Sequence, residues 1–131
     1  MKFGIFYEHQ IPRPWEEGDE HRLLKDALDQ VELADQLGFD YVWEVEHHFL
    51  EEYSHSSAPE VFLAACSQRT KNIRLGHGIV QMPPGYNHPA RVAERIATLD
   101  LVSGGRVDFG LGGPENAQLR RQRQLLDLRI W

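Results

Sequence analysis

Hydrophobic and polar positions alternate along this chain with two different periods. Short apolar runs of strand length, rich in β-branched and aromatic residues, lie at residues 2–7, 39–45, 73–80 and 106–110. Between these runs, apolar residues recur at three- and four-residue spacing, which is typical of helices with one buried face. The pattern therefore predicts strands and helices in strict alternation.

Three helices are predicted between the strands. The first begins at Asp19 and ends before Gly38, a residue typical of a helix C-cap. The second begins near Pro59, because proline is favoured in the first turn of a helix. The third follows His88 and Pro89 and ends at residues 103–105, Ser-Gly-Gly. Connections of helical length predict that successive strands run parallel, with right-handed crossovers.

Two α/β architectures have this order of elements. A doubly wound sheet usually carries a glycine-rich phosphate turn after a strand, and residues 110–115 form the only candidate in the sequence. This segment fails the pattern, because Glu115 stands where the last glycine belongs. The alternative is a (β/α)8 TIM barrel, which typically needs about 250 residues. The 131 residues are thus expected to form roughly half of such a barrel, about four βα units.

Composition narrows the classes of function. Asp and Glu number 20 against 14 Lys and Arg, for a formal net charge of -6, so nucleic acid and anionic membrane surfaces are disfavoured partners. No apolar run approaches the roughly 18 residues of a membrane span. The single Cys66 excludes an internal disulfide and fits a reducing compartment. We expect a cytoplasmic protein whose partner is a small molecule.

The clearest candidate for chemistry is Glu46-His47-His48, at the end of the second predicted strand. Active sites of (β/α)8 barrels form at this end of the strands. In an extended chain His47 and His48 face opposite sides, so only one of them can face a ligand. This argues against a paired-histidine metal site, and no spacing typical of zinc or iron ligands is present. A histidine that is held by hydrogen bonds and has no chemical role remains the alternative.

A second histidine, His77, lies between Gly76 and Gly78 in the third predicted strand. Glycine within a strand marks either a close approach of a ligand or of another backbone, or a bulge. The sequence leaves these interpretations open.

Several motifs resemble one known family in order and spacing. They are residues 2–6 (KFGIF), 38–43 (GFDYVW) with 46–49 (EHHF), 74–78 (RLGHG), 88–89 (HP), and 93–100 (AERIATLD) followed by 103–107 (SGGRV). Over about residues 1–113, the chain resembles the amino-terminal half of the bacterial luciferase-like flavin monooxygenases.

The resemblance implies a (β/α)8 barrel that uses reduced FMN, or in some relatives a deazaflavin, with the reduced flavin supplied by a separate flavin reductase. In that family dioxygen and reduced flavin form a peroxyflavin that oxidises a small organic substrate, and water must be kept away from it. The chain would then be a flavin-dependent monooxygenase, in a truncated form.

The resemblance also implies roles for particular residues. His47 matches the active-site histidine, and Phe6 lines the flavin pocket at the end of the first strand. Gly78 and Ile79 match a non-proline cis peptide bond beside the flavin ring, a form that costs about 3 to 4 kcal/mol. Gly112 lies near the reactive edge of the flavin. No metal ligand is implied.

Residues 114–131 depart from the family pattern and predict a short basic helix after an amino-terminal half-barrel of residues 1–113. Two other functions stay open: a non-catalytic half-barrel that binds flavin or a partner, and an inactive fragment of a truncated gene. Open first and fourth strands predict self-association through the sheet edges. A homodimer is also expected from the resemblance, and the apolar residues of the second and third helices are either its contact surface or part of the core. These residues are Phe62, Cys66, Ile96 and Leu99.

Overall fold

The computed structural model describes residues 1–82 and 87–110, and within them the predicted alternation of strands and helices is confirmed. The elements, in chain order, are β1 (Gly4–Tyr7), α1 (Asp19–Leu37), β2 (Tyr41–Glu44), α2 (Pro59–Arg69), β3 (Arg74–His77), α3 (Pro89–Ser103) and β4 (Val107–Phe109). Each strand is shorter than its apolar run. The predicted carboxyl-terminal helix, Gly112 and the proposed boundary at residue 113 lie outside the described residues.

The four strands of the described part form one parallel sheet in the order β1-β2-β3-β4. The register places residues of neighbouring strands in rows across the sheet. One row is Ile5, Val42, Leu75 and Val107; the next is Phe6, Trp43, Gly76 and Asp108; the third is Tyr7, Glu44, His77 and Phe109. Because side chains alternate between faces along a strand, the first and third rows share a face and the second row lies on the other.

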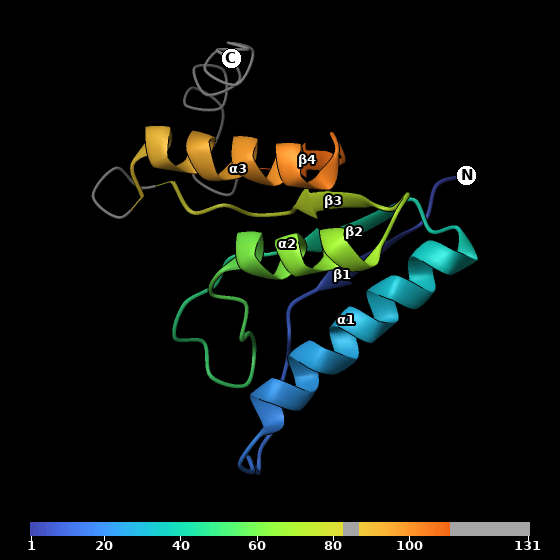
Figure 1. Ribbon diagram of the computed structural model, residues 1–131. Coiled ribbons are helices and arrows are strands. Elements are labelled where there is room, and N and C mark those ends of the chain that lie inside the picture. The colour runs from blue at the N-terminus through green and yellow to red at the C-terminus, as the bar shows by residue number, and fades with distance from the viewer. Residues whose placement is uncertain (83–86, 111–131) are drawn as a thin grey trace.

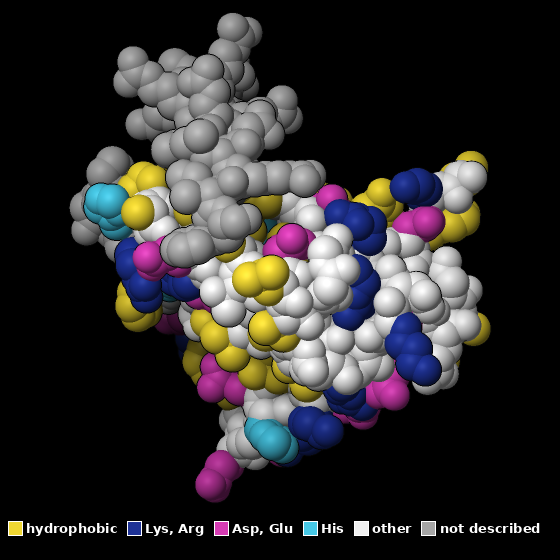
Figure 2. Space-filling view, turned by 45° about the horizontal axis from the view of Figure 1, so that its top comes forward, with side chains coloured by type: hydrophobic (Ala, Val, Ile, Leu, Met, Phe, Trp, Pro, Cys, Tyr) yellow, Lys and Arg dark blue, Asp and Glu magenta, His cyan; other side chains and the backbone are white. Residues whose placement is uncertain are grey.

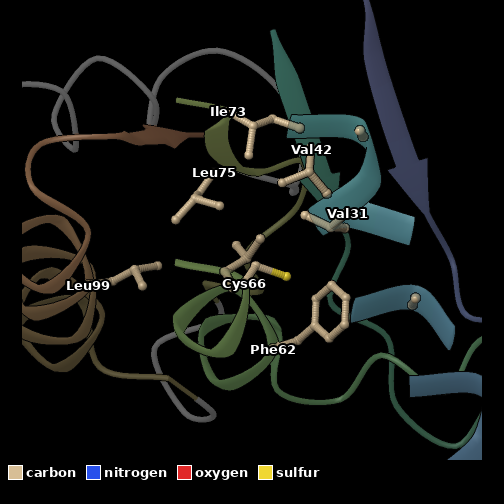
Figure 3. Packing of buried hydrophobic residues seen from close by; sticks show 10 residues of the cluster. Val31, Val42, Phe62, Cys66, Ile73, Leu75 and Leu99 are labelled. Carbon is tan, nitrogen blue, oxygen red and sulfur yellow. The ribbon is translucent and has the colours of Figure 1, made fainter. Parts of the chain in front are cut away.

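The three helices cover the face that carries the first and third rows, with α2 lying between α1 and α3 (Figure 1). The core on this face joins Val42 and Leu75 of the sheet to side chains from all three helices, which point toward one another in Figure 3. Val42, Leu63, Ile73 and Leu75 are completely buried. Burying such a side chain contributes roughly 1.5 to 3 kcal/mol, so this layer supplies most of the hydrophobic stabilisation.

Helix ends follow the predicted signals. Gly38 and Gly104 both adopt the left-handed conformation that ends α1 and α3, and each donates its backbone N–H back into the last turn. At the start of α3 the His88 ring accepts a hydrogen bond from the backbone N–H of Ala90. The spacing of capping residues therefore predicted these boundaries correctly.

The amino ends of the strands are held by two charged side chains. The Asp35 carboxylate accepts backbone hydrogen bonds from Lys71, Asn72 and Ile73 at 2.6–2.8 Å. The Arg106 guanidinium donates to four backbone carbonyls, at 2.8–3.2 Å, and to the hydroxyl of Thr70. The carbonyls belong to Ser67, Thr70, Ile73 and Ser103. These contacts tie α2 and α3 to the start of β3 and β4.

Of the two alternatives for Phe62, Cys66, Ile96 and Leu99, a contact surface or part of the core, the structure supports the core. All four are less than 10% exposed and pack inside, because they occupy the sides of α2 and α3 that turn toward the sheet. The exposed large hydrophobic residues of these helices are Val61, Leu101 and Val102. Figure 2 shows hydrophobic side chains grouped near the middle of one face, beside a row of Lys and Arg. Among the described helices, none combines the length and the apolar character needed to cross a bilayer.

Candidate functional site

The carboxyl ends of parallel strands meet at one edge of the sheet, and the segments that follow β1 and β2 are joined to each other there. The Ile11 N–H donates to the Glu52 carbonyl at 3.1 Å, and the His55 N–H donates to the His9 carbonyl at 3.0 Å. The two loops, residues 8–18 and 45–58, therefore form one layer over this edge.

Within this layer the predicted catalytic residue His47 faces a carboxylate. Its Nε2 lies 3.5 Å from Oε2 of Glu8, and both side chains are about one-fifth exposed. The ring meets Tyr53 edge-on, with centroids 5.7 Å apart. The backbone N–H of His47 donates to the carbonyl of Ser56 at 2.8 Å. An imidazole beside a partly buried carboxylate is suited to accepting or donating a proton at a ligand.

His48 has different partners from His47, as the alternation of side chains along an extended segment predicts. His48 Nε2 lies 2.9 Å from Oε1 of Glu46. Glu46 in turn accepts a hydrogen bond from the backbone N–H of Gln81 at 2.7 Å. His48 thus belongs to contacts that join the ends of β2 and β3, and the two adjacent histidines do not form one pair. In the described part of the chain, no group of three or more His, Cys, Asp or Glu is placed to hold a metal ion.

The face of the sheet away from the helices carries aromatic side chains and glycines. Phe6 is 56% exposed. The Trp43 ring lies across Gly76 so closely that a Cβ on that glycine would come within 2.2 Å of the indole. A Cβ on Gly78 would lie 3.2 Å from the Phe6 ring and 3.4 Å from the Glu44 carbonyl oxygen. The glycines therefore let the Trp43 and Phe6 rings lie close against the backbone of β3 and the residue that follows it.

The expected cis peptide bond between Gly78 and Ile79 is not found, and this prediction is wrong. Among the described residues, the only cis bond precedes a proline, between Arg13 and Pro14. A trans bond is the ground state for a non-proline residue, by about 3 to 4 kcal/mol. Here Gly78 donates its N–H to the Glu44 carbonyl at 2.7 Å with its following bond trans. Gly78 and Ile79 still follow β3 directly, at the edge that holds Phe6 and His47.

A buried polar cluster of His9, Glu44 and Ser56 lies behind this edge, and sequence reasoning missed it. His9 Nε2 lies 2.9 Å from Oε1 of Glu44, and the Ser56 hydroxyl contacts the same oxygen. All three residues are less than 5% exposed. Burial raises the pKa of Glu44 above its usual range, and the contacts with His9 and Ser56 offset this only in part. A signal was present, because Glu44 is a charged residue in an otherwise buried strand.

His77 lies on the helix-covered face, paired in register with Glu44 and edge-on to Phe109 at 6.0 Å. It is 1% exposed. Burial, with a smaller contribution from the positive charge of Arg95, lowers the pKa of His77 to about 4. His77 lies within the regular pairing of β3 with β2 and β4, so the glycines beside it do not mark a bulge. Its side chain is a neutral core histidine, and only the flanking glycines Gly76 and Gly78 face the open side.

Comparisons with known proteins relate the chain to one family of enzymes. A family model described as luciferase-like monooxygenase matches residues 1–123. The chain is 42% identical over 114 residues to limonene 1,2-monooxygenase of Rhodococcus erythropolis, covering 86% of this chain and 27% of that protein. It is 34% identical over 94 residues to an F420-dependent glucose-6-phosphate dehydrogenase of Amycolatopsis mediterranei, covering 70% of this chain and 28% of that protein.

A solved structure shows the same arrangement. The oxygenating constituent of 3,6-diketocamphane monooxygenase from Pseudomonas putida, in complex with FMN, aligns with a TM-score of 0.75 at 25% identity. The alignment covers 99% of this chain and 33% of that one. The chain therefore spans about a third or less of the length of these relatives. With the parallel sheet and its helices, the likeness confirms the expected fold class, the first part of a (β/α)8 barrel.

Proposed function

This chain belongs to the luciferase-like monooxygenase family, and from that premise we propose that it takes part in the flavin-dependent oxidation of a small organic substrate. The observation that carries the proposal is the pairing of His47 with Glu8 beside an open aromatic face at the carboxyl edge of the sheet. Because the chain spans only part of its relatives, turnover by these 131 residues is itself part of the proposal.

The residues at this edge fit a flavin ring. Phe6 offers an exposed aromatic surface, and Gly78, which has no side chain, allows the Phe6 ring to lie close to the end of β3. We propose that Phe6, Gly78 and Ile79 hold the ring, with Gly112, which lies outside the described residues, near its reactive edge. Relatives are named for both FMN and F420, so either a flavin or a deazaflavin suits the same surface. When bound in reduced form, the flavin supplies the electrons that activate dioxygen.

His47 holds and moves the proton in this scheme. Its Nε2 faces Glu8, whose carboxylate stabilises the protonated imidazole and orients the ring. The edge-on contact with Tyr53 further limits how the His47 ring can turn. The reduced flavin comes from a separate reductase, as the description of one relative as an oxygenating constituent suggests. Assembly as a homodimer remains a prediction.

Binding of flavin is the first test. The purified chain is titrated with FMN and with F420, each oxidised and then reduced, and absorbance and fluorescence are followed on a size-exclusion peak of known mass. Saturable binding in the micromolar range, about -8 kcal/mol, supports a formed site. A folded peak that binds neither cofactor contradicts the proposal for this chain and leaves the non-catalytic and inactive alternatives.

The role of His47 is tested by substitution. With limonene and a camphane diketone as trial substrates, His47→Ala is expected to lower substrate-dependent oxygen consumption about a hundredfold or more. Its flavin affinity should change little, because the loss concerns proton transfer and not binding. His21→Ala, an exposed position on α1, is the matched control and should keep full activity. Equal turnover in His47→Ala and His21→Ala would remove His47 from the mechanism.

A further inference from the structure

The buried cluster of His9, Glu44 and Ser56 joins the two segments that carry the proposed proton-transfer pair. Glu44 ends β2, His9 follows β1, and Ser56 belongs to the loop that leads to α2. The cluster lies on the helix-covered side of the sheet, beneath the ring of Phe62. At less than 5% exposure, none of its side chains is placed to touch a ligand on the open side.

One end of the cluster is bound to His47. The Ser56 hydroxyl contacts Glu44 and donates to the carbonyl of Val45 at 2.5 Å. The carbonyl of the same residue, Ser56, accepts the backbone N–H of His47 at 2.8 Å. Ser56 therefore fixes the main chain on both sides of Glu46, just where the strand ends and His47 turns toward Glu8.

The other end of the cluster controls the direction of Glu8. His9, the next residue, has a positive φ of 54°, an uncommon conformation for residues other than glycine. The His9 ring stacks on Tyr7 at 5.1 Å and meets Phe62 edge-on at 4.8 Å. Its Nε2 lies 2.9 Å from Oε1 of Glu44, so a turn of the ring would break this contact.

A polar cluster suits this task better than an apolar one. Apolar packing is not directional, whereas the hydrogen bonds of the Ser56 hydroxyl set both distances and angles, and the His9 ring lies 2.9 Å from the same Glu44 oxygen. Glu44 is the last residue of β2, so its position is fixed by the sheet. The loops of residues 8–18 and 45–58 therefore both contact the same atom, Oε1 of Glu44.

We propose that His9, Glu44 and Ser56 are positioning residues, which hold Glu8 and His47 at the separation that proton transfer requires. The proposal rests on the proposed function for its meaning, but the coupling between the loops is measurable without flavin or turnover.

Amide hydrogen exchange, followed by NMR on the isotope-labelled 131-residue chain, tests the coupling. His9→Leu keeps the volume and removes the ring nitrogen, and it is expected to speed exchange of the His47 N–H at least tenfold. His9→Gln keeps a donor near the same place and should leave that amide close to its original rate. Ser56→Ala is expected to loosen the opposite loop, which is read at the Ile11 N–H bonded to Glu52.

Two controls separate coupling from unfolding. The Leu75 N–H, bonded to the Arg106 carbonyl at 2.8 Å in the core, should keep its protection in every variant. Ser57→Ala removes a hydroxyl from the adjacent exposed position and should change neither loop amide. If His9→Leu also loses protection at Leu75, Ser56→Ala alone decides. Unchanged exchange at Ile11 in a folded Ser56→Ala, or at His47 in a folded His9→Leu, overturns the proposal.

Activity then distinguishes the two proposals. If the unsubstituted chain consumes oxygen with flavin and substrate, Ser56→Ala should lower kcat about tenfold with flavin affinity and KM within twofold, because the proton-transfer geometry is lost and binding is not. If the unsubstituted chain shows no turnover but the exchange effects appear, positioning stands and the proposed function fails. Unaltered kcat in Ser56→Ala with full turnover would exclude a catalytic purpose for the cluster.

Discussion

The two ends of the strands differ in how completely their polar side chains are hydrogen-bonded. At the amino edge, Asp35 accepts three backbone hydrogen bonds and Arg106 donates to four carbonyls. At the carboxyl edge lie the buried side-chain nitrogen and oxygen atoms that lack a hydrogen bond within the described residues. They belong to Glu8, His9, Glu44, His55 and His77.

The difference indicates that the amino edge of the sheet contributes stability, whereas the carboxyl edge holds the polar groups available for chemistry. Unpaired buried groups cost free energy, so a protein keeps them where they serve something other than stability. At the amino edge the opposite holds. Although burial acts in the other direction, hydrogen bonds from Lys71, Ile73 and Asn72 lower the pKa of Asp35. Stability from Asp35 is therefore present above its unfolded pKa and lost as the pH falls through the folded value.

The largest expected change in stability comes from a substitution at the amino edge. Arg106→Ala leaves several carbonyls between α2, α3 and β3 without their donor, and it is expected to reduce the free energy of unfolding by about 3 kcal/mol. Urea denaturation at pH 7 measures it. Arg91→Ala removes an exposed ion pair with Glu94 on α3 and should cost less than about 0.5 kcal/mol. Equal losses in the two variants would contradict the assigned importance of this edge.

The next prediction concerns acid at the carboxyl edge. The pKa of His77 falls to about 4 in the fold, so protonation favours the unfolded chain and stability declines as the pH falls from about 6.5 toward 4. The decline attributable to His77 is about 3 kcal/mol at pH 4. In His77→Leu this part of the pH dependence should vanish, as measured by urea unfolding at a series of pH values. His21→Leu, altered at an exposed site, should retain it.

The smallest expected change in stability concerns Glu44, at the carboxyl edge. Burial raises the pKa of Glu44. The contribution of Glu44 to stability is therefore fully present below its unfolded pKa and is lost as the pH rises through its folded pKa. Gln cannot ionise, so the stability of Glu44→Gln relative to the unsubstituted chain should rise with pH above the unfolded pKa of Glu44. Glu94→Gln, at an exposed position, serves as the control. A difference that stays constant with pH would show that ionisation of Glu44 costs nothing.

Together these variants separate stability from positioning. Glu44→Gln is expected to be the more stable protein at neutral pH and to hold His47 less firmly, because the carboxylate that contacts both His9 and Ser56 is replaced by an amide. Cys66, packed nearby, takes no part in acid–base chemistry: burial, followed by the charge of Glu44, raises the pKa of its thiol to about 12.

Local pattern by itself determined the order of the elements, the ends of α1 and α3 at Gly38 and Gly104, and the place of His47 after β2. These features depend on residues a few positions apart, which is the range over which helical spacing and capping act. The motifs also identified the family, and the comparisons confirmed it. The alternation of side chains along β2 likewise separated the surroundings of His47 and His48.

Only the tertiary structure decided what the polar residues face. Parallel register brought Glu44 level with His77 and aligned it with His9, 35 positions earlier in the chain. It also turned Phe62 and Leu99 inward and set Glu8 opposite His47. No periodicity in the sequence fixes which strand residues meet across a sheet, since that register follows from the packing of all three helices on one face.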